Sequence, residues 1–154
     1  MNAIHFPIQF RWADMDANYH LRHSVYYDLG AQARVLAITA AGITMARMKE
    51  DGFGPILFRE ECLFKREMRM EHNVEVLVRL SKARPDGSRW TFSHEFVRDD
   101  GEMCATITAD GAWMDTAKRK LTVPSRDLMD AFMLLPRTAD FEMLPMPLDR
   151  VTSA

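Results

Sequence analysis

The stretch that decides the fold is RWADMDANYHLRHSVY, residues 11–26. It begins at the end of Ile4–Trp12, a segment rich in β-branched and aromatic residues that predicts a strand. Asp and Asn then favour a turn over residues 13–18. From Val25 onward, apolar residues recur every three or four positions, which is typical of one face of a helix. The stretch therefore joins a strand to the start of a long helix.

Ser24 is the predicted N-cap of this helix, because a serine hydroxyl can accept a hydrogen bond from an unpaired backbone N–H. Gly42 is expected to bend or break the helix, with helical character resuming through Met48. Gly52, Gly54 and Pro55 then mark the return to an extended chain.

The remaining chain predicts four strands. Alternating apolar residues and two strong turn signals, 84–87 and 99–101, separate the strands from one another. A short helix is expected from Pro124 to about Met133, and the proline-rich tail from about Pro136 is expected to be irregular. The four strands are predicted at 56–66, 74–80, 90–96 and 103–114.

This order of elements predicts one α+β domain over residues 1–154, with a long central helix packed on a five-stranded antiparallel sheet. Tight turns join antiparallel neighbours, and one long helix is available to cover the apolar face of the sheet. Exposed strand edges invite pairing with a second copy of the chain.

Composition narrows the function classes. A formal charge of −2 argues against a broad nucleic-acid surface, which needs clustered positive charge. No apolar stretch approaches the roughly 20 residues that span a bilayer, and the N-terminus lacks a signal-peptide pattern, so we expect a cytoplasmic protein without membrane insertion. Cys62 and Cys104 lack paired CxxC spacing, so no metal or other cofactor is expected.

The chemistry is concentrated where the loop meets the helix. A helix N-terminus offers unpaired N–H groups and a partial positive charge, which can polarise a carbonyl oxygen. A nearby carboxylate can activate water or attack directly. Asp14 and Asp16 are candidates, although a pair of acids in a loop is equally typical of a turn. Asp14 is expected to support the loop or to pair with Arg11 or Arg22, and His94, between Phe92 and Phe96, is expected to be a core histidine.

At these positions the sequence resembles the hot-dog-fold acyl-CoA thioesterases, in the 4-hydroxybenzoyl-CoA thioesterase-like branch. Members resemble R-[WF]-x-D-x-D-x-x-G-H-[VI]-N-N-x-x-Y before the central helix. This chain has Tyr19 at the glycine and Arg22-His23 at the asparagine pair, and it has Ala31-Gln32 where the helix often carries an acid. The matching residues are Arg11, Trp12, Asp14, Asp16, His20 and Tyr26, with Ala33-Arg34 further along the helix.

The resemblance implies an acyl-CoA substrate and Asp16 as the catalytic residue, either as nucleophile or as general base. It implies that the His23 backbone N–H polarises the carbonyl, and that the site forms between subunits of a homodimer or a dimer of dimers. A non-catalytic protein that binds acyl thioesters or lipids is the alternative, favoured by the departures at Tyr19 and Arg22-His23. The acyl group is not indicated by the sequence. The substrate-binding candidates are His20, His23, Ser24, Tyr26, Glu61 and Arg66.

Overall fold

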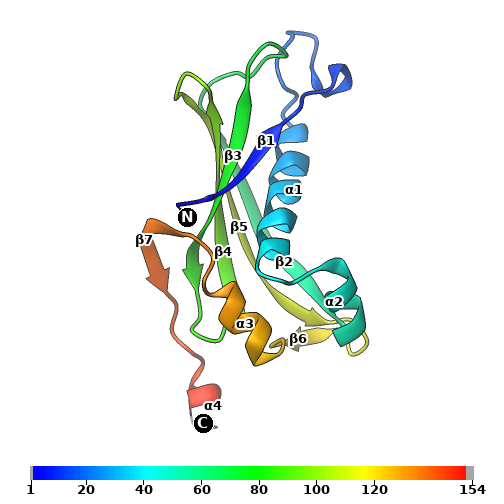
Figure 1. Cartoon of the computed structure of the whole chain (residues 1–154), viewed down its shortest axis with the longest axis vertical. Helices are drawn as coiled ribbons and strands as arrows, with labels where there is room; N and C mark the ends of the chain where they lie inside the picture. Colours follow the sequence, from blue (N-terminus) through cyan, green and yellow to red (C-terminus); the bar gives the residue numbers. More distant parts are fainter. Residues whose placement is uncertain (1, 152–154) are drawn as a thin grey trace.

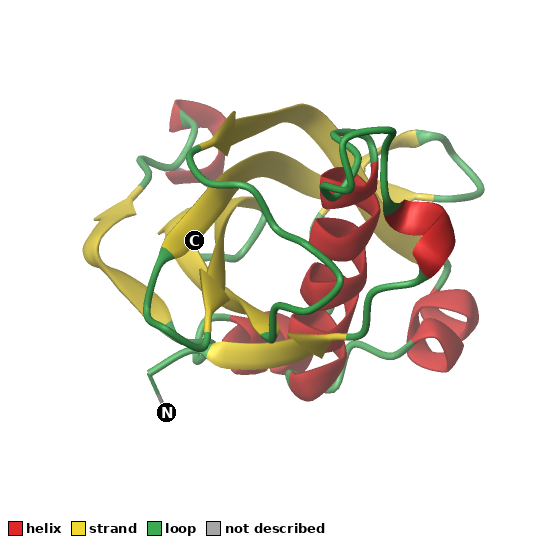
Figure 2. Cartoon of the chain, turned by 90° about the horizontal axis from the view of Figure 1, so that it is seen from above, coloured by secondary structure: helices red, strands yellow, loops and turns green. Residues whose placement is uncertain are grey.

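The long helix α1 (Val25–Ala40) lies against one face of a curved sheet (Figure 1). This computed structural model describes residues 2–151. Viewed from above, the strands curve around one side of α1 (Figure 2). The other elements are β1 (Ile4–Ile8), the 3₁₀ helix η1 (Trp12–Asp14), α2 (Met45–Asp51), β2 (Phe53–Phe64), β3 (Val74–Ala83), β4 (Arg89–Arg98), β5 (Met103–Asp115), β6 (Lys120–Thr122), α3 (Arg126–Phe132), β7 (Arg137–Met143) and α4 (Leu148–Val151).

The sheet has the strand order β1-β3-β4-β5-β2, and all neighbours along this path are antiparallel. These are the five strands that the sequence predicts. β2 precedes β3 in the chain but lies at the edge of the sheet beyond β5, with β5 and β4 between it and β3. The connection 65–73 therefore crosses one end of the sheet. The prediction of an α+β hot-dog fold, with one central helix on an antiparallel sheet, is confirmed. The sheet is larger than the five strands predicted, because β6 pairs with β5 and β7 pairs with β3.

Close packing holds α1 on the sheet. At Gly30 an added Cβ would lie 2.9 Å from Ile107 Cδ1, closer than real Cβ contacts allow, so the absence of a side chain lets the helix approach β5. His94 is fully buried beneath α1, which confirms the expected core histidine. Arg34 donates to its Nε2, so Nδ1–H donates to the Ile107 carbonyl. Burial lowers the pKa of His94 to about 3 and keeps the ring neutral.

The first strand is shorter than predicted. It ends at Ile8, and Trp12–Asp14 forms η1 because the Asp14 carboxylate accepts the Arg11 backbone N–H in a capping box. The N-cap prediction for Ser24 is wrong in its mechanism. Ser24 flanks α1 with helical backbone angles, but its side chain makes no capping hydrogen bond and accepts one from Arg22 instead.

The chain breaks after α1, as predicted. Gly42 adopts a φ of +84°, and α2 follows at an angle of 71° to α1. Within residues 2–151, no single helix is long and apolar enough to cross a membrane, and α1 and α2 meet the length and composition test only as this bent pair.

The expectation of an irregular tail is wrong. Arg137–Met143 forms β7, which pairs in parallel with β3, and the Pro136 carbonyl accepts the Leu80 N–H at 2.8 Å. The tail's prolines, 136, 145 and 147, flank this strand and do not interrupt it, so its N–H groups remain available for pairing. Arg137 also lies over the ring of Phe141, 4.3 Å from its centroid.

Candidate active site

The loop that precedes α1 forms one side of a cavity of about 430 Å³ at the end of the molecule where α1 begins (Figure 1). The other side comes from the end of β2 and the residues that follow it. Five of the seven site residues that the sequence predicts line this cavity. The full lining is Asp16, His20, Leu21, His23, Tyr26, Phe64, Lys65, Arg66 and Glu67.

Asp16 is an exposed carboxylate held by backbone donors. Its Oδ1 accepts the N–H of Asn18 at 2.8 Å and the N–H of His20 at 3.2 Å. The hydrogen bond from His20 is the main cause that lowers the pKa of Asp16, aided by the bond from Asn18 and by the nearby charges of His20 and His23. Asp16 is therefore ionised at neutral pH, which is the form that a general base or a nucleophile requires.

Tyr19 adopts the backbone conformation of the glycine that it replaces. Its φ is +63°, in the left-handed region where glycine is favoured. The turn closes because the Asp16 N–H donates to the His20 carbonyl at 2.8 Å and the Tyr19 N–H donates to the Asp16 carbonyl at 3.0 Å. The departure is thus one of residue type, and the turn itself is retained.

The His23 N–H donates no hydrogen bond within residues 2–151. The N–H of Leu21 donates to Met68, that of Arg22 to Asp14 and that of Val25 to Arg22, whereas the Ser24 N–H, like that of His23, donates no hydrogen bond within residues 2–151. His23 lines the cavity and Ser24 does not, so the His23 N–H is an unpaired backbone donor beside the cavity at the start of α1. This is the donor that the resemblance implies.

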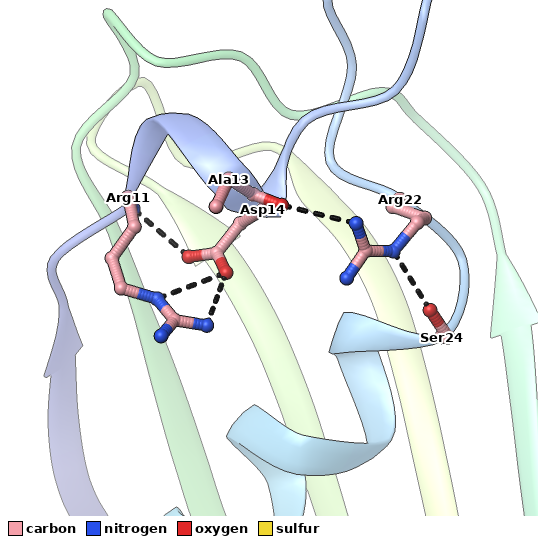
Figure 3. A network of polar contacts seen from close by, with 5 residues as sticks. All are labelled: Arg11, Ala13, Asp14, Arg22 and Ser24. Carbon is pink, nitrogen blue, oxygen red and sulfur yellow. Dashed lines mark hydrogen bonds and ion pairs between the residues drawn. The ribbon is translucent and has the colours of Figure 1, made fainter.

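Ion pairs and hydrogen bonds brace the loop (Figure 3). Asp14 is only 2% exposed, and its Oδ1 accepts hydrogen bonds from Arg11 Nη2 at 2.7 Å and from Arg11 Nε at 3.1 Å. Of the two partners predicted for Asp14, Arg11 and Arg22, the ion pair is made with Arg11. The Arg11 hydrogen bond is the main cause that lowers the pKa of Asp14. Arg22 donates to the Ala13 carbonyl and to the Ser24 hydroxyl, both at 3.0 Å.

Aromatic rings form the inner wall. Tyr26 meets Phe64 edge to face at 4.9 Å between centroids and lies 5.6 Å from Phe96. Burial raises the pKa of Tyr26 to about 12, so its phenol stays neutral. This wall is suited to an apolar group that enters from the cavity.

Two cations lie on the rim. The N–H groups of Lys65 and Arg66 both donate to the Cys104 carbonyl, at 2.8 Å and 2.9 Å, which fixes the chain where it leaves β2. Within residues 2–151 neither side chain pairs with a carboxylate: Lys65 Nζ contacts Met103 Sδ, and Arg66 Nη1 donates to the Lys65 carbonyl. Both charges are therefore available to an anionic ligand.

Glu67 completes the rim. Its carboxylate lies 3.1 Å from the Arg69 guanidinium and 3.8 Å from His20 Nε2. Leu21, Phe64, Lys65 and Glu67 were not among the predicted site residues. The connection 65–73 has no periodic pattern that links it to the loop before α1, and the contact is made by the bond from the Leu21 N–H to the Met68 carbonyl.

The structure places the other two predicted residues outside the cavity. The Ser24 hydroxyl is bonded to Arg22. Glu61 and its neighbour Glu60 have different partners: Glu61 pairs with Arg59 at 2.6 Å, and Glu60 pairs with Arg34 at 3.3 Å beneath α1. Within residues 2–151, no three His, Cys, Asp or Glu side chains are arranged to hold a metal ion.

Comparison with known proteins identifies the family. The family model for the thioesterase-like superfamily matches residues 10–132, from the loop through α3. No curated protein matches the chain.

Solved structures show the same fold. A hypothetical protein from Staphylococcus aureus in complex with CoA has a TM-score of 0.81 at 10% identity, over 96% of this chain and 91% of that one. A DHNA-CoA thioesterase from Staphylococcus aureus has a TM-score of 0.78 at 19% identity, over 86% and 90%. A 1,4-dihydroxy-2-naphthoyl-CoA thioesterase from Synechocystis has a TM-score of 0.75 at 12% identity, over 88% and 99%. The chain belongs to the thioesterase-like superfamily.

Proposed function

We propose that the protein is an acyl-CoA thioesterase, which hydrolyses its substrate to a free carboxylic acid and CoA. The observation that carries this proposal is one cavity that holds an ionised carboxylate, Asp16, and an unpaired helix N-terminal donor, the His23 N–H. Membership of the thioesterase-like superfamily supports the thioester as the bond that is cleaved.

In this mechanism the thioester carbonyl oxygen accepts the His23 N–H. The donor is fixed by the backbone and lies at the positive end of the α1 dipole, so it stabilises the negative charge that develops on this oxygen. Asp16 takes a proton from water as the water oxygen attacks the carbonyl carbon. The C–S bond then breaks, and CoA leaves as a thiolate that takes up the proton.

Direct attack by Asp16 is the second route. The carboxylate oxygen bonds to the carbonyl carbon, the C–S bond breaks, and water hydrolyses the resulting anhydride. A single turnover in ¹⁸O-labelled water tests for this route. If water attacks the Asp16 carbonyl of the anhydride, ¹⁸O enters the Asp16 carboxylate, whereas general-base hydrolysis places ¹⁸O only in the product acid.

The rest of the cavity suits an acyl-CoA. We assign the phosphates to Lys65 and Arg66, whose charges are unpaired within residues 2–151. Tyr26 and Phe64 would contact the acyl group, and His20 would face the thioester from the Asp16 turn. Ser24 would act only through its bond to Arg22.

We also propose a cytoplasmic homodimer or dimer of dimers. β2 lies at the edge of the sheet and pairs only with β5 within the described chain. Its exposed apolar side chains include Leu57, Phe58, Leu63 and Phe64, and pairing of two such edges would cover them. Glu61, in the second half of this strand, would then face the neighbouring subunit. Light scattering at micromolar concentration should give a multiple of 17.8 kDa, and a monomer mass alone would contradict an intersubunit site.

A panel of acyl-CoA substrates tests the function, with CoA release read by a thiol reagent and binding read by calorimetry. Turnover of at least one substrate is expected. The alternative is a non-catalytic acyl-thioester or lipid-binding protein, favoured by Tyr19 and by Arg22-His23, where the thioesterases it resembles carry glycine and asparagines. Binding without turnover across the panel would support that alternative.

A further inference from the structure

We propose that Arg22 is a positioning residue that holds the Asp16 carboxylate and the His23 N–H against the same cavity. The inference rests on the proposed function for its catalytic consequence. Its structural content, that the Arg22 side chain fixes the loop, is testable without any activity.

Arg22 joins the two arms of the loop (Figure 3). On the η1 side, its backbone N–H donates to the Asp14 carbonyl at 2.8 Å and its Nη1 donates to the Ala13 carbonyl at 3.0 Å. On the helix side, its Nε donates to the Ser24 hydroxyl at 3.0 Å, and its carbonyl accepts the Val25 N–H at 3.0 Å. One residue thus links the segment before Asp16 to the first turn of α1.

The two catalytic groups lie on either side of this link. Asp16 lies two residues after Asp14, and His23 directly follows Arg22. Between them, the loop is closed by the Asp16–His20 backbone bond and by the isolated bridge between Met15 and Leu21. A shift at Arg22 would therefore move the donor and loosen the turn that holds the carboxylate.

The chemistry of the guanidinium fits this task. Within the described residues, Arg22 forms no ion pair with a carboxylate, and both side-chain bonds go to neutral oxygens, a carbonyl and a hydroxyl. Arginine presents several N–H donors in a rigid plane, whereas lysine has one point charge. Arg22 reaches the two oxygens with two different nitrogens, Nε and Nη1, whereas a lysine would have one nitrogen for both.

Kinetics of Arg22→Ala, Arg22→Lys and Arg126→Ala test the role. Misplacement of catalytic groups by about 1 Å costs on the order of 10²-fold, so Arg22→Ala should lower kcat by that order and Arg22→Lys by less. KM should stay near the wild-type value because the cavity rim at Lys65 and Arg66 is untouched. The Arg126 side chain is 95% exposed on α3, so its replacement should change neither constant. An unchanged kcat in a folded Arg22→Ala variant would overturn the proposal.

A titration of the Asp16 carboxyl by NMR is the readout that does not need activity. Loss of the link should weaken the bonds from Asn18 and His20, so the pKa of Asp16 should rise toward its ordinary value in Arg22→Ala and stay unchanged in Arg126→Ala. The other titratable groups that line the cavity are the same in both variants: His20, His23, Tyr26, Lys65, Arg66 and Glu67.

Ser24→Ala keeps the test open if Arg22→Ala does not fold, since it removes only the acceptor on the helix side. A smaller rise in the Asp16 pKa is then expected. If the wild-type protein hydrolyses no thioester, the proposed function fails, but the titration still decides the positioning role. An Asp16 titration that is identical in the wild type and in every folded variant of Arg22 and Ser24 overturns it.

Discussion

Replacement of Tyr19 by glycine should stabilise the protein. Tyr19 has a φ of +63°, and an L-residue in the left-handed region costs roughly 1–2 kcal/mol. The side chain is 80% exposed, so its removal sacrifices little packing. Glycine adds chain freedom to the unfolded state, which costs roughly 0.5–1 kcal/mol. The difference predicts a gain of up to about 1.5 kcal/mol in the free energy of unfolding.

Thermal and urea denaturation followed by circular dichroism measure this gain. For a chain of this length, Tm should rise by roughly 2–4 °C for each kcal/mol. Tyr19→Ala is the matched control, because alanine keeps the Cβ and hence the strain while it also removes the ring. Arg119→Gly is a second test, since Arg119 has a φ of +56°. A Tm for Tyr19→Gly at or below that of Tyr19→Ala would refute the reasoning.

Three further predictions concern the loop and the helix start. Asp14→Asn should lower the free energy of unfolding by about 1.5–3 kcal/mol, the typical contribution of a hydrogen bond to a charged group, while it lowers kcat less than Asp16→Asn does. Because the pKa of Asp14 is depressed in the folded state, this contribution is present above the ordinary carboxyl pKa and is lost as pH falls through the folded pKa. The urea midpoints of the wild type and Asp14→Asn should therefore converge in acid, and a gap that stays constant with pH would contradict this. His23→Asn should retain activity and His23→Pro should lose about 10²–10³ in kcat in a folded protein, whereas equal losses would make the imidazole essential. The acidic limb of kcat/KM, measured from pH 3 upward, should lie below the ordinary aspartate pKa of about 3.9 if it reports Asp16, and a limb near pH 6 would assign it to another group.

The elements that carry a clear period were predictable. Val25 and Ala33 mark α1, and the alternation of Val74, Val76 and Val78 marks β3, because a buried face imposes the period of the secondary structure on the sequence. Leu36 has the same spacing but is 39% exposed. The loop residues of the site have no hydrophobic period. They were predictable only from the sequence motif that this chain shares with the thioesterases it resembles.

What the sequence could not supply depends on contacts between distant segments. β7 pairs with β3 more than fifty residues away, and no local pattern encodes a parallel partner. Glu67 lines the cavity from the connection after β2, which bonds to Leu21 through the Met68 carbonyl. The Ser24 hydroxyl had a plausible partner in the helix, but the Arg22 guanidinium, a charged donor, occupies it.

The most direct test of the account is the rate of CoA release by the wild type and by Asp16→Asn, with substrate binding measured in parallel. Asparagine keeps the shape of the side chain and removes its charge, so the fold and the Kd for the acyl-CoA should be retained. A lost general base typically costs about 10²–10⁴ in rate, and kcat should fall by that amount. An Asp16→Asn variant that releases CoA at the wild-type rate would remove Asp16 from the mechanism and contradict the account.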